Sequence, residues 1–310
     1  MNIVIMGATS HIAKGLIDKF IRSGEHHLYL YSRSAGKVQQ FLTAIGCSGD
    51  RNYEICSDYQ TFSHSSYDVI INCIGVETRN KHNCDFTRYF SVTEEFDNLA
   101  IGYLMGRNPV ALYISFSSGA VYGKGFSIPA AESSMNCLPV NQVQPEDYYA
   151  IARINAEAKH RAHPDLRILD LRIFSYFSRF INLSDGYFIT DVMEAILKQK
   201  VLITDRVNIV RDYLHPEDLF AMIVTCINAG KLNQALDVNS SSPVSKLEIL
   251  EYFTSEYGLK YESRNFSRNQ SATGAKSNYY STCTRASRIG YSPRYSSMDS
   301  LKHEASYILH

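Results

Sequence analysis

The sequence predicts an α/β protein in which a doubly wound parallel sheet carries a smaller C-terminal α/β lobe. Its first residues form an apolar strand, Asn2 to Met6, which leads through a tight turn into an amphipathic helix. Two later β-branched and aromatic runs, 68–75 and 111–116, have the composition of buried strands. Strands that alternate with helical patterns in this way build parallel sheets.

The remaining elements follow in the order that such a fold requires. The other predicted strands are 28–31, 53–56 and 166–174, and helices are predicted from about 11, over 35–45 and 86–105, from about 148, and over 213–230. We expect a main domain over 1–174 and about 206–234, and a second lobe over about 175–205 and 235–310. The polar segment 77–85 is predicted to line the cleft, and 265–288, rich in Ser, Asn and Arg, to form a surface loop.

Composition narrows the classes of function. The chain of 310 residues has 31 Lys and Arg and 31 Asp and Glu, so its net charge gives no electrostatic case for binding nucleic acid or an anionic membrane. No apolar run reaches the roughly 18 residues of a membrane helix, and no signal peptide is recognised. Seven cysteines without a C-x-x-C motif fit a reduced compartment, and His215, like most of the ten histidines, has no partner at metal-ligand spacing. We expect a cytoplasmic protein with no membrane segment and no metal site.

The turn after the first strand has features of a Rossmann-type dinucleotide fingerprint. Small residues there let the backbone approach a pyrophosphate at the helix N-terminus. Gly7 is the one usual glycine that remains, and Ser10 and Ala13 occupy the positions of the other two. Taken alone, the stretch is explained about as well by an ordinary buried strand-turn-helix unit. The predicted cofactor contacts are Gly7, Thr9, Ser10, His11 and Ile12.

Tyr149 and Arg153 lie four residues apart in a predicted helix and share one face. A phenol has a pKa near 10, but a fixed cation lowers that pKa, and a nearby hydroxyl can share its proton. Ser118, where the 111–116 strand ends, is the candidate hydroxyl. Such a group can protonate a carbonyl oxygen while a hydride arrives at the carbon. The alternative is that Tyr149 is one of 22 tyrosines, that Arg153 is solvated and that the serines form a polar loop.

Seven stretches together indicate a family. They are the N-terminal strand-turn-helix, S-S-G-A-V-Y-G from Ser117, Y-A-I-A-R from Tyr149, L-R-I-F from Leu171, R-D-Y-L-H-P-E-D-L from Arg211, D-V-N from Asp237 and I-G-Y-S-P from Ile289. In this order they resemble the extended short-chain dehydrogenase/reductases, the NAD(P)-dependent epimerase/dehydratase family. The departures are the two missing glycines, Arg153 where the family has lysine, and Ser175 where sugar-nucleotide epimerases often place an asparagine.

The resemblance implies a dinucleotide cofactor. Where an acid would bind the ribose 2′-hydroxyl, the sequence has Ser32 and Arg33, which favour a 2′-phosphate, so we predict NADP over NAD. The alternative is that Arg33 is only a solvated loop residue. The other cofactor contacts that the resemblance implies are Asp58 at the adenine, Cys73, Ile74 and Gly75 beside the ribose and nicotinamide, Tyr149 and Arg153 at the nicotinamide ribose, and Phe174.

The resemblance also implies a nucleoside-diphosphate sugar as the substrate. Arg211 matches an arginine that contacts the diphosphate, and the other predicted substrate contacts are Ser117, Ser118 and Ser175. In this family the helices near 86–105 and from about 148 usually pair with those of a second copy, so a homodimer through a four-helix bundle is expected.

Three functions remain open at this point. The first is NADPH-dependent reduction of a keto group, at C4, of a nucleotide-activated deoxy sugar, with Tyr149 as proton donor. The second is an NAD-dependent nucleotide-sugar 4-epimerase, and the third is a non-catalytic dinucleotide-binding protein. A 4,6-dehydratase fits less well, because it needs an acid directly after Ser118, where Gly119 and Ala120 stand.

Overall fold

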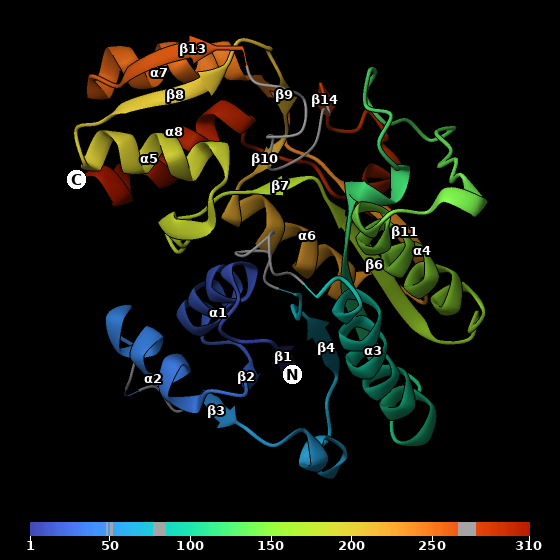
Figure 1. Ribbon diagram of the computed structural model, residues 1–310. Helices are drawn as coiled ribbons and strands as arrows, with labels where there is room; N and C mark the ends of the chain where they lie inside the picture. Colours follow the sequence, from blue (N-terminus) through green and yellow to red (C-terminus); the bar gives the residue numbers. More distant parts are fainter. Residues whose placement is uncertain (48, 50–51, 77–84, 266–276) are drawn as a thin grey trace.

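The computed structural model describes residues 1–310 except 48, 50–51, 77–84 and 266–276, and it has the predicted α/β architecture (Figure 1). Seven parallel strands form the main sheet in the order β11-β6-β5-β4-β1-β2-β3. The order reverses between β1 and β4, and ligands of such sheets bind beyond the carboxyl ends of the strands at this point. The strands are β1 (Asn2–Met6), β2 (His27–Tyr31), β3 (Tyr53–Cys56), β4 (Val69–Asn72), β5 (Leu112–Ser118), β6 (Arg167–Ile173) and β11 (Asn233–Val238).

Helices cover both faces of the sheet (Figure 1). Successive residues of β1 point to opposite faces, so Ile3 and Ile5 enter one hydrophobic core while Val4 and Met6 enter the other. The first core is closed by α1 (His11–Ser23), α2 (Ala35–Ala44) and α6 (Pro216–Asn228), and the second face is covered by α3 (Arg88–Gly106) and α4 (Tyr148–Arg161).

The ends of α1 and α6 follow from their sequences. Ser10 caps α1, because its Oγ accepts a hydrogen bond from the backbone N–H of Ala13 at 3.3 Å, and Gly24 ends the helix at a φ of 67°. At α6, the His215 side chain is the cap and Pro216 takes the first helical position. These caps fix where both helices begin, at the edge of the sheet where a ligand would bind.

The smaller lobe has its own hydrophobic core around Phe177, Val192 and Phe253. Among the described residues, no helix has both the length and the apolar character needed to span a bilayer. The elements of the lobe are α5 (Phe188–Leu197), α7 (Lys246–Tyr257) and α8 (Ser297–Leu309), the pair β8 (Val201–Asp205) and β13 (Lys260–Arg264), the pair β7 (Ser175–Tyr176) and β10 (Tyr213–Leu214), and the group β9 (Val210–Arg211), β12 (Val244–Ser245) and β14 (Asn278–Tyr279).

Two sequence expectations need adjustment. The predicted boundary between 234 and 235 falls inside β11, whose six residues all pair with β6, so the main sheet continues to Val238. The predicted surface loop at 265–288 contains β14 and the 3₁₀-helix Arg285–Ile289. Its residues 266–276, and 77–84 of the predicted cleft segment, lie outside the described part of the chain.

Candidate active site

Tyr149 and Arg153 meet on one face of α4, as their spacing predicts. The Arg153 Cζ lies 5.4 Å from the centroid of the Tyr149 ring, which places the cation beside the phenol. The Arg153 Nε is buried and has no hydrogen-bond partner among the described residues. Because an unpaired buried donor costs free energy, a ligand oxygen at this point would stabilise the guanidinium. This is the position where a nicotinamide ribose is expected.

The first turn of α4 is held in place from two sides. The Asp147 carboxylate accepts a hydrogen bond from the backbone N–H of Gln144 at 3.0 Å and pairs with Lys124 at 2.7 Å. On the other side, the Tyr149 ring packs edge-on against the ring of Tyr89 on α3, with 5.3 Å between centroids. These contacts hold the start of α4 and the Tyr149 ring against neighbouring elements.

Ser118 ends β5, and its hydroxyl already has two partners. Its Oγ accepts a hydrogen bond from the backbone N–H of Ala120 at 3.2 Å and lies 3.1 Å from the hydroxyl oxygen of Tyr279. Tyr279 belongs to β14, so the smaller lobe reaches the catalytic strand. Burial is the main cause that raises the pKa of Tyr279, which keeps its phenol protonated.

Tyr279 is surrounded by groups that the sequence placed in the site. Its ring packs against Phe174 with 5.1 Å between centroids, and the Arg211 guanidinium carbon lies 5.7 Å from its ring centroid. Arg211 is only 6% exposed, and burial lowers its pKa. A buried cation beside Tyr279 is suited to bind an anionic ligand such as a diphosphate.

The other predicted substrate serines lie in different surroundings. Ser117 points away from Ser118 along the strand alternation, and its Oγ donates a hydrogen bond to Glu157 Oε1 at 2.6 Å. Ser175 is the first residue of β7, where it pairs with Tyr213 of β10. The structure therefore brings Ser118 and Arg211 together around Tyr279, while Ser117 joins a buried network.

The turn between β1 and α1 fits a dinucleotide. Gly7 has a φ of 74°, and a Cβ at this residue would lie 2.9 Å from Ile74 Cγ1 and 3.1 Å from the backbone of Cys73. Only glycine at this position therefore allows the turn, which also contains Thr9, to pass so close to the end of β4. The α1 N-terminus, capped by Ser10, presents backbone N–H groups and a partial positive charge toward this edge.

The structure places the remaining predicted cofactor residues around that edge in different ways. Phe174 is buried beside Tyr279, whereas Gly75 is exposed and a Cβ there would meet nothing within 4 Å. His11 Nε2 lies 2.7 Å from Ser178 Oγ, and burial lowers the His11 pKa to about 4, so the imidazole is neutral. Ile12 packs against the first hydrophobic core.

Ser32, Arg33 and Asp58 follow β2 and β3. The Ser32 Oγ is buried and accepts a hydrogen bond from the backbone N–H of Ser34 at 3.1 Å. Arg33 is exposed and forms no hydrogen bond or ion pair with any other described residue, so its guanidinium is available to a ligand. Asp58 is also exposed, and its carboxylate caps a 3₁₀-helix by accepting a hydrogen bond from Gln60 N at 2.8 Å.

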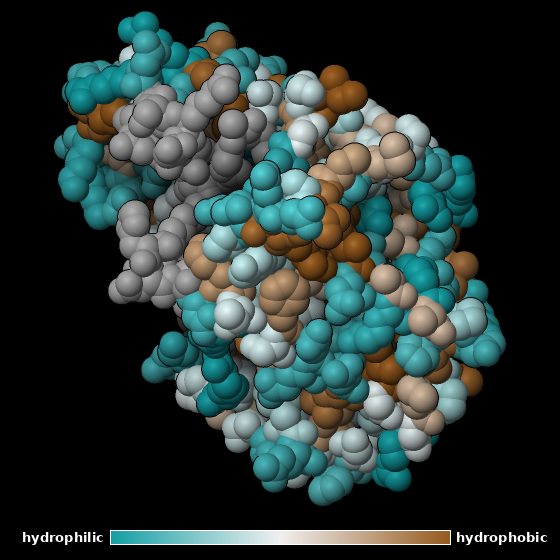
Figure 2. All heavy atoms as spheres, turned by 45° about the vertical axis from the view of Figure 1, so that its right-hand side comes forward, coloured by the Kyte–Doolittle hydropathy of each residue, from teal (hydrophilic) through white to brown (hydrophobic). Residues whose placement is uncertain are grey.

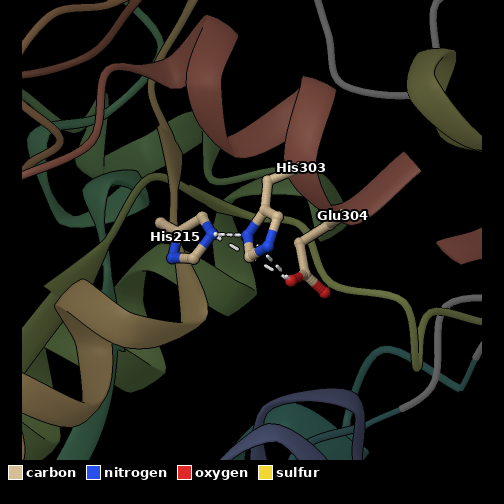
Figure 3. A group of neighbouring side chains, drawn as sticks. All are labelled: His215, His303 and Glu304. Atoms are coloured by element: carbon tan, nitrogen blue, oxygen red, sulfur yellow. Dashed lines mark hydrogen bonds and ion pairs between the residues drawn. The ribbon is translucent and has the colours of Figure 1, made fainter. Parts of the chain in front are cut away.

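A second cluster, which sequence spacing could not reveal, joins His215, His303 and Glu304 (Figure 3). His215 Nε2 lies 2.7 Å from His303 Nδ1, and the Glu304 carboxylate is 4.0 Å from His215 and 3.7 Å from His303. Three such groups can hold a metal ion. Because His215 and His303 are 88 residues apart, no local motif connects them.

The hydrogen bonds of this cluster favour a hydrogen-bonded chain of side chains over a metal centre. The backbone N–H of Glu217 donates to His215 Nδ1 at 3.0 Å, so the proton of the neutral ring is on Nε2 and points at His303. A metal-bound imidazole would instead donate from its other nitrogen. Glu304 is also engaged, because Arg179 binds its carboxylate through the backbone and the side chain. The prediction of no metal site stays untested.

Comparisons with known proteins agree with the fold. The family model described as "NAD dependent epimerase/dehydratase family" matches residues 3–239, so the chain belongs to this family. No curated protein matches the chain in the sequence search.

Several solved structures share the whole fold. The UDP-glucuronic acid 4-epimerase from Bacillus cereus in complex with NAD is 17% identical with a TM-score of 0.78, and the match covers 99% of this chain and 98% of that one. The UDP-glucose-4-epimerase from Stenotrophomonas maltophila with bound NAD is 16% identical with a TM-score of 0.82, covering 99% and 98%. The dTDP-glucose 4,6-dehydratase from Bacillus anthracis is 15% identical with a TM-score of 0.78, covering 99% and 96%.

Proposed function

We propose that this chain is a dinucleotide-dependent oxidoreductase that acts on a nucleoside-diphosphate sugar and reduces a keto group, at C4, with NADPH. The observation that carries the proposal is the Arg153 guanidinium beside the Tyr149 ring, on the helix that packs at the end of the strand carrying Ser118. Membership of the epimerase/dehydratase family supports the same chemistry.

Each catalytic residue has one task. The cofactor, when bound, supplies the hydride that reaches the carbonyl carbon. Tyr149 donates its phenolic proton to the carbonyl oxygen, and Ser118 donates a hydrogen bond that holds that oxygen in place. A guanidinium is a cation that does not act as a proton donor in proteins, so Arg153 would favour the phenolate left on Tyr149 without transferring a proton itself.

The lobe supplies the substrate contacts in this proposal. Arg211 would bind the diphosphate, because it is a buried cation next to Tyr279. Tyr279 now holds the Ser118 hydroxyl at 3.1 Å, so a substrate carbonyl would take over that contact. The protein would thus form its catalytic hydrogen bond only when the sugar is in position.

NADPH and NAD correspond to different reactions here. The exposed Arg33 favours NADPH, which a reductase consumes and exchanges. The three similar structures named above are those of epimerases and a dehydratase, and all three contain NAD, which supports a 4-epimerase as the second candidate. An epimerase keeps its NAD and returns the hydride to the other face of the sugar.

The test is a cofactor and substrate assay of the purified protein. Stoichiometric NAD that survives gel filtration would favour the epimerase, whereas an empty protein that binds NADPH favours the reductase. Oxidation of NADPH at 340 nm with a panel of 4-keto sugar nucleotides would support reduction. NADPH binding without oxidation by any member of a broad panel would favour a non-catalytic binding protein.

A homodimer through α3 and α4 is a further proposal. The two helices pack side by side, and Ser91, Glu94, Glu95 and Asn98 of α3 are exposed. In Figure 2 the surface turned toward the viewer mixes polar and apolar side chains. The four exposed polar residues of α3 would be part of such an interface, and light scattering after gel filtration measures whether the dimer forms.

A further inference from the structure

A buried group of charged side chains lies behind the catalytic face of α4. Glu157, four residues after Arg153, is 8% exposed, and its Oε1 accepts the hydrogen bond from Ser117 at 2.6 Å. Arg172 of β6 binds the same carboxylate through Nε at 3.0 and 3.2 Å and through Nη2 at 2.5 Å. One carboxylate on α4 therefore binds two neighbouring strands of the sheet.

The network extends from Arg172 to the end of β11. The Arg172 Nη1 donates a hydrogen bond to the Tyr122 hydroxyl at 2.8 Å and lies 3.5 Å from Asp237. Tyr122 in turn donates to both oxygens of Asp237, at 3.0 and 2.9 Å, and the Ser281 hydroxyl donates to the same carboxylate at 2.5 Å. Every carboxylate in this network is paired. The network therefore fixes the positions of its residues more than it adds to the net stability of the fold.

The arrangement joins the two halves of the catalytic site. Ser117 directly precedes Ser118 in β5, and Glu157 is on the same helix as Tyr149. We infer that Glu157 is a positioning residue that fixes the distance between Ser118 and Tyr149 by binding Ser117 and Arg172. This role rests on the proposed function, in which both hydroxyls must reach one carbonyl oxygen, and a small displacement of either costs turnover.

The network is also open to small molecules. Glu157, Arg172, Tyr122 and Asp237 are among the residues that line a cavity of about 450 Å³. A carboxylic acid from solution can therefore reach the place that the Glu157 carboxylate would leave in a shortened variant. Glu157→Ala keeps the Cβ, so acetate has the size of the missing part.

The experiment compares three variants under the same conditions. We expect Glu157→Ala to lower kcat about tenfold to a hundredfold, with the KM of the sugar nucleotide and the Kd of NADPH changed less than about threefold. Acetate should restore kcat in a saturable way, and Ser117→Ala should lower kcat less. The matched control is Asp170→Asn, which removes a buried carboxylate that joins β6 to the far end of α4 through His160 and Arg161. It should keep kcat within about threefold.

Other results would overturn the role. They are an equal loss of kcat in Glu157→Ala and Asp170→Asn, a loss that acetate does not reverse, or a rise in KM with kcat unchanged. If the parent protein reduces no sugar nucleotide, the proposed function fails, but the positioning role is still measurable. Amide hydrogen exchange at 116–118 should then rise in Glu157→Ala and fall again with acetate, and unchanged exchange would refute the role.

Discussion

Arg33 is the residue on which cofactor choice depends, because it is exposed and has no partner in the described part of the chain. If it pairs with a 2′-phosphate, Arg33→Ala should weaken NADPH binding by about 1.5 to 3 kcal/mol, the range for hydrogen bonds to charged groups. NADH binding should stay nearly unchanged, and so should NADPH binding by the control variant Arg107→Ala, which removes an exposed cation at the end of α3. Fluorescence titration measures both affinities, and equal losses for the two cofactors would refute the assignment.

Tyr279 shows where reasoning from single residues stops. The sequence around it, rich in Ser, Asn and Arg, predicts a surface loop, yet its phenol lies 3.1 Å from Ser118 across 161 residues of chain. Nothing local marks such a contact, because it depends on how β14 adds to β9. The Tyr149–Arg153 pair was predictable because both residues are on one helix, where spacing alone determines which side chains meet.

At the scale of elements, Asp218 has a larger role than its sequence position predicts. An acid in the first turn of a helix is expected to interact with the helix dipole. In the structure the buried Asp218 carboxylate also accepts hydrogen bonds from the backbone N–H groups of Arg294 and Tyr295, at 2.9 and 3.0 Å. It therefore fastens the segment before α8 onto α6.

Asp218→Ala should lower the free energy of unfolding by about 1.5 to 3 kcal/mol, because charge-assisted hydrogen bonds are lost and buried donors remain. Asp218→Asn keeps one acceptor and should lose less. Urea unfolding measures the difference, with Asp165→Ala as control, because that aspartate is exposed and its pair with Lys231 contributes little. A change in Asp218→Ala no larger than in the control would show that the hydrogen bonds do not stabilise the fold.

Local elements were more predictable than their ends and their long-range partners. The strands of the main sheet follow from β-branched runs such as 68–75, and the parallel order follows from alternation with helices. The sequence did not show that β11 joins the edge of the main sheet after α6, because the hydrophobic pattern does not tell which strand it pairs with. The cluster of His215, His303 and Glu304 was missed for the same reason.

At the scale of the whole molecule, three histidines shape the dependence of stability on pH. Burial lowers the pKa of His11 and of His215 to about 4. Burial also opposes protonation of His160, but hydrogen bonds with Asp170 and Asp97 outweigh it and raise its pKa to about 9. His11 and His215 therefore affect stability on the acid side, and His160 affects it on the alkaline side.

The signs follow from an unfolded histidine pKa near 6.5. Between pH 6.5 and 4, His11 and His215 bind protons in the unfolded chain but not in the folded protein. The free energy of unfolding therefore falls as the pH is lowered, by up to about 3 kcal/mol for each residue. The contribution of His160 is complete below pH 6.5 and is lost as pH rises toward 9. We expect a maximum of stability near pH 6.5, measured by urea unfolding. His160→Gln should flatten only the alkaline side, and a steady rise in parent stability from pH 6.5 to 9 would contradict this account.

The central claim is that Tyr149 supplies the proton, and single-turnover kinetics of Tyr149→Phe tests it most directly. The variant removes only the phenolic oxygen, so the ring contacts with Tyr89 and Arg153 are kept and NADPH should bind with nearly the parent Kd. With a 4-keto sugar nucleotide that the parent reduces, hydride transfer should fall by at least about a hundredfold, the low end of general acid catalysis. Reduction at the parent rate would contradict the account, and another acid in the cleft would then have to supply the proton.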